Sequence, residues 1–363
     1  MKNKNISQLQ AVFFIIQTQI SIGLLALPHM LMKRAGSDGW ISILLSGVLI
    51  QVTISLYMIL FFRFPKLTFY EMLEKMFGKY VGKALQLIYI CYFMLNCVLI
   101  LSVFSRILDI WVLPLTPNWV ISLMIVFGSV YIAKEPIQAI ARFSFVLTPI
   151  MVGLSLPLIY TLGDADISYI LPIFQGDVRE IFWASQDMFV SMNGFESMLI
   201  IAPLVKGTVR QRYKIMTIAN LFTTFYYLYI TVTCFVIFSP EEINIIPEPV
   251  LYLLKTVSFR VIERTDLIFL TFWFVTVFAT LANVFYLAST GAAKLFGKHD
   301  HKWFVYILSA IVFMLSISAT RTDQSVHVVD QVSRIADFIF VYLFPVIVAL
   351  IAFMMKKGGR HAL

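Results

Sequence analysis

The sequence predicts an all-α, polytopic membrane protein, and three observations support this prediction. Of its 363 residues, 60% are hydrophobic and only 13% are charged, whereas a soluble domain carries about 25% charged residues. Apolar stretches of about 20 residues, enough for a helix to cross a bilayer, recur along the whole chain. These stretches lack the alternation of apolar and polar residues that marks a membrane β-barrel. Helices therefore remain as the structure that satisfies backbone amides inside lipid.

Ten long apolar windows predict ten transmembrane helices in a single transmembrane domain that covers residues 1–363. The windows lie at about 9–32, 40–62, 84–105, 112–133, 140–162, 182–205, 213–238, 267–290, 302–320 and 335–355. The fourth is the weakest, because Pro114 and Pro117 fall in its first turns. The first is longer than the apolar core of a signal peptide and has no cleavage site, so we interpret it as a retained span.

The distribution of charge predicts the orientation. With the N-terminus in the cytoplasm, most of the 28 lysines and arginines fall in cytoplasmic segments, and most of the 20 acidic residues fall outside. Both termini are therefore predicted to be cytoplasmic. The formal net charge of +8 is in this interpretation a topology signal, with attraction to the lipid bilayer second, and we expect no binding to nucleic acid.

One outer segment, residues 239–266, contains three prolines followed by the sequence VLYLLKTVSFRVIE. Four apolar residues in it are spaced to share one face of a helix: Val250, Leu251, Leu254 and Val257. The pattern predicts an interfacial or lid-like outer helix at about 249–262.

The windows divide into two sets of five, residues 9–162 and 182–355. An odd number of crossings in each half places the second half upside down relative to the first, which is the inverted-repeat plan of many transporters. That plan predicts broken helices at corresponding places in the halves, namely windows one and six.

Window one carries the expected interruption in TQISIGLLALP. Thr18, Ser21 and Gly23 lie at mid-membrane depth, and Pro28 follows them. Glycine costs a helix about 1 kcal/mol relative to alanine, and proline removes a backbone hydrogen bond. We expect an unwound turn whose free N–H and C=O groups suit the carboxylate and ammonium groups of a zwitterion.

Window six carries SMNGFESMLIIAP, with Asn193 and Gly194 at mid-membrane depth and Pro203 after them. Close helix packing explains any single glycine, but matching interruptions in both helices favour a binding site. Glu196 is interpreted as the only carboxylate deep in a span, since Asp187 lies near the outer end. A buried ionisable residue in lipid is typically functional. Four roles remain open for Glu196: facing a ligand amine, relaying a proton, accepting hydrogen bonds from unwound backbone, or locking span six to a neighbour.

Windows three and eight each present polar residues at helical spacing. Tyr89, Phe93 and Asn96 recur in window three, and Thr276, Thr280 and Val284 form a row in window eight beside Asn283. Aromatic stripes are typical of cores, whereas polar groups in a membrane bundle generally turn inward. The Asn and Thr residues are therefore the stronger candidates for a ligand site.

The sequence favours neither an enzyme nor a metal protein. Its three cysteines and five histidines show no metal-ligand spacing, so we expect no metal and no cofactor. The motifs HExxH and GxSxG and paired catalytic carboxylates are absent from the sequence, so we expect no enzymatic activity.

Four segments resemble the B subunit of spore germinant receptors. They are ISQLQAVFFIIQTQISIGLLALP, SDGWISILLSG, FVSMNGFESMLIIAPLVKG and TLANVFYLASTGAAKLFG. That family belongs to the amino acid–polyamine–organocation superfamily, so the resemblance, which covers essentially the whole chain, implies a LeuT-like 5+5 inverted repeat. It also implies a nutrient-sensing subunit in the spore inner membrane that works with an A subunit and a lipoprotein C subunit. An amino-acid permease that transports the same ligand is the alternative.

The resemblance further implies a small-molecule nutrient, expected to be an amino acid, bound between spans one, three, six and eight. The residues of this chain at the matching positions are Thr18, Ser21, Gly23, Asn96, Asn193, Gly194, Glu196, Thr280 and Val284. Two departures stand out. Ser21 replaces the first glycine of the family's frequent Gly-x-Gly, and residues 140–162 lack the lysine found in some proton-coupled relatives.

Overall fold

The computed structural model describes residues 5–20, 22–174, 176–257, 264–320 and 322–354. Within these ranges the regular structure is helical, and extended chain pairs at a single parallel bridge between Ile6 and Val205. There the Ile6 amide donates to the Leu204 carbonyl at 2.8 Å, and the Lys206 amide donates to the Ile6 carbonyl at 3.0 Å. The bridge joins the start of the first half of the chain to the end of window six.

The helices follow the order of the apolar windows. The first half contains α1 (Gln8–Gln19), α2 (Leu27–Ala35), α3 (Gly39–Arg63), α4 (Phe69–Trp111), α5 (Asn118–Ala133), α6 (Ile137–Ser155) and α7 (Leu158–Thr161). The second half contains α8 (Val178–Ser191), α9 (Met198–Ile201), α10 (Val209–Ile237), α11 (Pro240–Ile245), α12 (Pro249–Thr256), α13 (Thr265–Leu295), α14 (Lys302–Ala319), α15 (Asp323–Asp337) and α16 (Phe344–Met354).

Local sequence explains where several of these helices begin. Ser7 and Gln10 form a capping box at the start of α1, and Thr208 and Gln211 form one at the start of α10. In each, the hydroxyl accepts from a backbone amide three residues later, and the glutamine side chain reaches back to the cap amide.

Seven helical segments of the described chain are long and apolar enough to cross a membrane. Windows one and six do not form single long helices, because one is divided between α1 and α2 and the other between α8 and α9. Window four forms α5, which has only 16 residues. The protein is an integral membrane protein of broken-helix type, while the count of ten complete crossings stays a prediction for these three windows.

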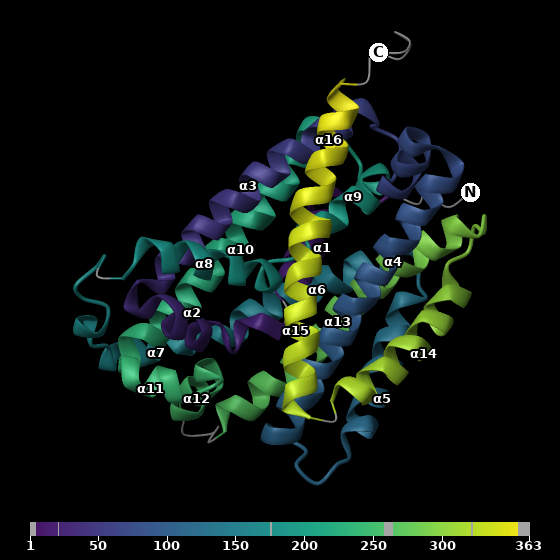
Figure 1. Ribbon diagram of the computed structural model, residues 1–363. Helices are drawn as coiled ribbons and strands as arrows, with labels where there is room; N and C mark the ends of the chain where they lie inside the picture. Colours follow the sequence, from purple (N-terminus) through teal and green to yellow (C-terminus); the bar gives the residue numbers. More distant parts are fainter. Residues whose placement is uncertain (1–4, 21, 175, 258–263, 321, 355–363) are drawn as a thin grey trace.

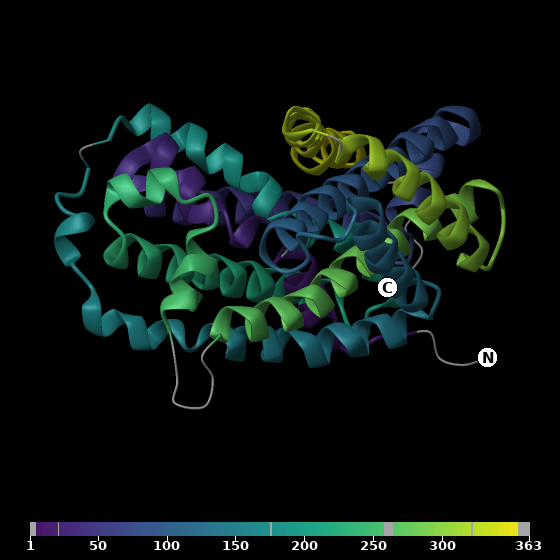
Figure 2. The same cartoon turned by 90° about the horizontal axis from the view of Figure 1, so that it is seen from below.

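The first helix occupies the centre of the bundle. It packs against α6, α10 and α13, so it touches both halves of the chain. On one side of it, α4, α5, α13 and α14 pack together, and on the other side α3 packs on α8 and α10 (Figure 1). Figure 2 shows α15 and α16 on one face of the bundle and α6 on the opposite face.

The outer segment forms two short helices rather than one. Val250, Leu251, Leu254 and Val257 are all buried, because α12 packs on α13, α10 and α2. Figure 1 shows α11 and α12 at the end of the bundle away from α9 and the end of α16. The segment therefore packs on the bundle at that end, and the last part of the predicted helix, residues 258–262, lies outside the described residues.

Candidate ligand-binding site

Window one is broken after Gln19, as the sequence predicts. Ile20 leaves the helix with φ −82° and ψ 88°, and a 3-10 turn at Ile22–Leu24 precedes α2. The predicted site residue Ser21 lies outside the described residues. Pro28 falls in the first turn of α2, where a backbone N–H has no helical partner in any case, so the proline begins the second half-helix rather than breaking the first.

Window six is broken at Gly194. This residue has φ +130°, a conformation that side-chain-bearing residues rarely adopt, and it follows the end of α8 at Ser191. A 3-10 turn at Phe195–Ser197 leads into α9. Pro203 again lies at the start of a helical piece, the turn Ala202–Leu204. Both predicted interruptions are therefore confirmed, and glycine rather than proline marks each one.

The two breaks touch each other. A Cβ added to Gly23 would lie 2.5 Å from the Ser191 hydroxyl, and one added to Gly194 would lie 2.6 Å from the Gln19 backbone nitrogen. Contacts this short mean that a Cβ at either glycine would force its neighbours to move, the Ser191 side chain at Gly23 and the backbone of Thr18 and Gln19 at Gly194. Close helix packing and a break in the helix are thus both properties of these two glycines, because each glycine lets the other broken helix approach it.

Helix α1 ends with three consecutive polar residues, Gln17, Thr18 and Gln19, and their side chains bind partners on different helices. Gln17 is fully buried, and its amide nitrogen donates to the Thr276 carbonyl at 3.1 Å. Thr148 donates to the Gln17 side-chain oxygen at 3.1 Å, and Thr280 donates to the Gln17 carbonyl at 2.8 Å. The predicted site residue Thr280 therefore anchors the end of α1 to α13.

Thr18 and Gln19 continue this anchoring. The side-chain amide of Asn283 donates to the Thr18 hydroxyl at 2.9 Å. The side-chain amide of Gln19 donates to the Met192 carbonyl of the second broken helix at 3.1 Å. The Tyr227 hydroxyl lies 2.7 Å from the Ser191 carbonyl and 3.1 Å from the Gln19 carbonyl. Carbonyls freed by unwinding in both broken helices are thus capped by side chains of the protein.

Glu196 caps the opposite, N–H end of the second break. It is only 5% exposed, and its Oε2 accepts from the Gly194 amide at 2.7 Å. A carboxylate at the start of a half-helix is favoured by the backbone dipoles. Of the four roles left open by the sequence, acceptance of hydrogen bonds from the unwound backbone is the one that this geometry displays.

Asn193 directly precedes Gly194 at the second break, and its side chain, unlike the groups above, is not hydrogen-bonded in the described residues. Both polar atoms of its side-chain amide are buried, and neither has a hydrogen-bond partner in the described part of the chain. An unpaired buried polar group costs about 1–3 kcal/mol, so such groups call for a ligand or water. Asn193 is therefore a point of the paired breaks at which a polar ligand would gain hydrogen bonds, and the buried Ser197 hydroxyl of the same break is likewise without a partner in the described residues.

The remaining predicted site residues lie apart from this point. Val284 is buried on α13, one turn beyond Thr280. The Asn96 side-chain amide on α4 donates to the Tyr92 carbonyl at 3.4 Å and, at 3.5 Å, to Asp337 Oδ1. Among the described residues it makes no hydrogen bond to the broken helices. Asp337 is fully buried, and its Oδ1 also accepts from the Tyr92 hydroxyl at 2.9 Å.

The interpretation that Glu196 is the only carboxylate deep in a span is therefore wrong. The predicted window ten begins at 335, which would leave Asp337 near a membrane surface. In the structure α15 begins at Asp323, and helical chain runs on through a π-helix at Phe338–Leu343 into α16, so Asp337 lies in the middle. The charged residues before 335 lower the hydropathy of this stretch and so hide a helix that the protein itself buries.

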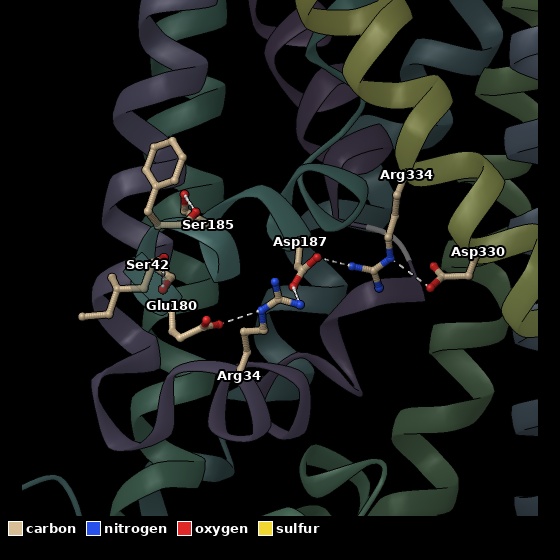
Figure 3. A network of polar contacts seen from close by, with 9 residues as sticks. Arg34, Ser42, Glu180, Ser185, Asp187, Asp330 and Arg334 are labelled. Atoms are coloured by element: carbon tan, nitrogen blue, oxygen red, sulfur yellow. Dashed lines mark hydrogen bonds and ion pairs between the residues drawn. The ribbon is translucent and has the colours of Figure 1, made fainter. Parts of the chain in front are cut away.

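An ion-pair network links α2, α8 and α15 (Figure 3). Asp187 lies between two arginines, 3.6 Å from Arg34 and 3.0 Å from Arg334. Arg34 also contacts Glu180 at 3.2 Å, and Arg334 contacts Asp330 at 3.0 Å. All five side chains are partly exposed, so each pair contributes only about 0–1 kcal/mol and the network can open at small cost.

Several residues of the site were not singled out in the sequence: Gln17, Gln19, Thr148, Tyr227 and Asp337. The glutamines had a local signal, since QTQ is an unusually polar run inside an apolar window. Asp330, Ser333 and Asp337 also recur at helical spacing. Tyr227 and Thr148 had none, because their role depends on contacts with residues far away in the chain.

Comparison with known proteins shows the family and the fold of the chain. The model of the family described as "Spore germination protein" matches residues 5–324. Among curated relatives, Spore germination protein YndE of Bacillus subtilis (strain 168) is 27% identical over 359 residues, which cover 98% of each chain. Spore germination protein GerQB of Bacillus cereus is 25% identical over 340 residues and 93% of each chain.

Among solved structures, MhsT in complex with L-phenylalanine superposes with a TM-score of 0.67 at 12% identity, covering 97% of this chain and 99% of that one. A Na+-coupled sialic acid symporter superposes with a TM-score of 0.65 at 13% identity, covering 93% and 79%. At such identities the likeness shows the fold alone, which is LeuT-like.

Proposed function

The chain belongs to the spore germination protein family, and from this premise we propose that it is the nutrient-sensing B subunit of a germinant receptor. The nutrient is an amino acid that binds at mid-membrane depth between the two broken helices. The protein resides in the spore inner membrane with both termini in the cytoplasm, and the A and C subunits read the state of its bundle.

The observation that carries this proposal is the Asn193 amide, which lies at the paired breaks with both polar atoms unpartnered in the described residues. Around it, the carbonyls of Ser191 and Gln19 are held by Tyr227, and the Gly194 amide is held by Glu196. A ligand that displaced these internal partners would lose as much as it gained. Asn193 offers hydrogen bonds without that loss.

The capping pattern also orients the ligand. Since the Glu196 carboxylate already occupies the N–H end of the second half of window six, the ligand carboxylate would meet repulsion there. Its place is the other N–H end, at the 3-10 turn Ile22–Leu24 that begins after the first break. The ammonium group then faces Glu196 and the Asn193 side-chain oxygen.

Signalling follows from a change in equilibrium between states of the bundle. A ligand shifts such an equilibrium only by its differential affinity for the two states. The network of Arg34, Asp187 and Arg334 links α2, α8 and α15. Binding at the breaks would move α2 and α8, which carry Arg34 and Asp187, and so break or tighten this link.

The test is amino-acid binding to the purified protein in lipid nanodiscs, measured by isothermal titration calorimetry across a panel of amino acids. We expect Asn193→Ala to weaken binding at least about tenfold, the equivalent of the 1.4 kcal/mol that one or two hydrogen bonds supply. Asn244→Ala is the matched control, because Asn244 is exposed on α11 and its side-chain amide donates to the nearby Pro240 carbonyl. Equal affinities of the two variants would reject the site.

A second candidate function is an amino-acid permease that uses the same pocket. It is favoured by the LeuT-like fold, which the chain shares with a Na+-coupled symporter. Counterflow of a labelled amino acid in proteoliposomes separates the two. Sensing predicts binding without flux by the subunit alone, and robust flux that Asn193→Ala abolishes would replace the sensor by the permease.

A further inference from the structure

The second polar cluster, around Asp337, lies outside the proposed nutrient site. Asp337 ends α15 where the chain passes into the π-helix Phe338–Leu343, a geometry that is rare and often functional. Its side chain is 0% exposed, and Oδ1 accepts from the Tyr92 hydroxyl at 2.9 Å and, more weakly, from the Asn96 amide at 3.5 Å. Asp337 Oδ2 has no hydrogen-bond partner in the described residues.

A second unpartnered atom lies one helical turn away. Ser333 is also 0% exposed, and its hydroxyl is likewise without a partner within the described ranges. Residues four apart on a helix lie on the same face, so Ser333 and Asp337 share one face of α15. No hydrogen bond joins their side chains in the described residues, so a rotation of one of the two side chains is needed to pair them. An ionised Asp337 would leave Oδ2 as a buried negative charge, which costs several kcal/mol in such surroundings.

The charged and titratable groups that face Asp337 do not neutralise it. On α4, the Tyr92 hydroxyl donates to Asp337 itself, and the Tyr89 hydroxyl donates to the Phe340 carbonyl. On α3, the Tyr57 hydroxyl donates to the Val341 carbonyl. The nearby acids are Glu196, beyond the second break, and Asp330 on α15, whose charges repel a negative Asp337.

The nearest guanidinium along the helix is already engaged. Arg334 contacts Asp330 at 3.0 Å and Asp187 of α8 at 3.0 Å. The remaining facing group, Tyr342 in the π-helix, is a neutral phenol that contacts the Phe195 ring at 5.9 Å. Asp337 therefore has donors on one oxygen and no paired cation among the described residues.

We propose that Asp337 is a proton-binding site, in which the proton resides on Oδ2 and is donated to the Ser333 hydroxyl. The proton comes from water and returns to it, so no other reactant is needed. Protonation removes the buried charge, pairs the two unpartnered atoms, and leaves Oδ1 to accept from Tyr92 and Asn96. The site lies outside the proposed nutrient pocket, and its test needs no nutrient.

Infrared spectroscopy of the protein in nanodiscs, with aspartate carboxyl groups labelled with 13C, tests the proposal without a nutrient. We expect a band of a protonated carboxyl group at neutral pH that carries the isotope shift. It should be lost in Asp337→Asn and when the pH is raised. Asp266→Asn is the matched control, because Asp266 is equally buried but paired with Arg264 at 2.8 Å, and the band should persist in it.

Two further measurements keep the proposal open to rejection. Ser333→Ala should move the band, because it removes the acceptor of the proposed hydrogen bond, and this variant serves even if Asp337→Asn does not fold. A labelled band that is absent at neutral pH, that survives in Asp337→Asn, or that does not move in Ser333→Ala would overturn the assignment. A band that appears only when sodium is removed would assign the site to an alkali cation instead.

Discussion

The two broken helices lie against each other, yet they hold their unwound backbone in different ways. The first break is tied by side chains that come from elsewhere in the bundle: Thr280 of α13 and Tyr227 of α10 both donate to carbonyls at the end of α1. The second break also has distant ties, from Tyr227 to the Ser191 carbonyl and from Gln19 to the Met192 carbonyl, but it adds a local one, because Glu196 accepts from the amide of Gly194. The first break thus depends on tertiary packing, and the second on both tertiary packing and its own local sequence.

This difference has a consequence for function. A break held by distant side chains moves only when the helices that supply them move, whereas a locally capped break keeps its shape as α8 or α9 shifts. We therefore expect the second break to act as a preformed platform for ligand and the first to report binding to the rest of the bundle. Substitutions at the two breaks should separate these roles.

The largest expected effect is that of Gly194→Ala. Positive φ strain at a residue with a side chain costs about 1–3 kcal/mol, and the overlap with the backbone of Thr18 and Gln19 adds to it. We expect a marked fall in the thermal unfolding midpoint or loss of the protein from the membrane. Gly153→Ala on α6 is the control, since an added Cβ there meets nothing within 4 Å. Comparable midpoints for both variants would show that the breaks are not in contact.

Removal of the local cap comes next. Glu196→Ala leaves the buried Gly194 amide without its acceptor, at a cost of about 1–3 kcal/mol in the free energy of unfolding. Glu196→Gln keeps a side-chain oxygen at the same reach, so it should retain most of the stability while it removes the charge. Thermal unfolding of both variants in the same detergent is the measurement. If Gln is as damaging as Ala, the charge of Glu196 rather than the hydrogen bond holds the second break.

Loss of a distant cap should cost less. Tyr227→Phe removes one hydroxyl hydrogen, shared between the Gln19 and Ser191 carbonyls, and we expect a loss of about 0.5–1.5 kcal/mol. Hydrogen exchange of the backbone around both breaks should rise in the same variant. Tyr80→Phe, at an exposed position on α4, provides the baseline. Exchange that rises at only one break would mean that Tyr227 does not join the two.

The same contrast explains what the sequence could predict. The breaks themselves were predictable, because glycine and polar residues inside an apolar window are local signals that the backbone obeys. The Glu196 cap was among the predicted roles for the same reason, since donor and acceptor are two residues apart. The partners of the first break were not, because Tyr227 and Thr148 approach it only once the helices are packed.

Asp337 is a residue whose burial the local sequence does not predict. A hydropathy average begins a predicted span where the charged residues end. The charged residues of α15, however, contact other helices: Arg334 pairs with Asp187 of α8, and Asp337 accepts from Tyr92 of α4. A window average treats these residues as membrane-external. Only the pairing of Tyr92 and Asn96 with Asp337 reveals that the helix continues inward.

The smallest expected effect on stability is that of Asn193→Ala, and it gives the sharpest comparison between the breaks. Because neither amide atom has a partner in the described chain, truncation removes no protein hydrogen bond and relieves two unpaired buried groups. The unfolding midpoint without ligand should stay unchanged or rise slightly. The ligand-induced rise in midpoint should shrink, because stabilisation by a ligand follows its affinity for the folded state. A variant that is destabilised without ligand would place Asn193 among the structural caps, with Tyr227 and Glu196, and remove it from the proposed ligand site.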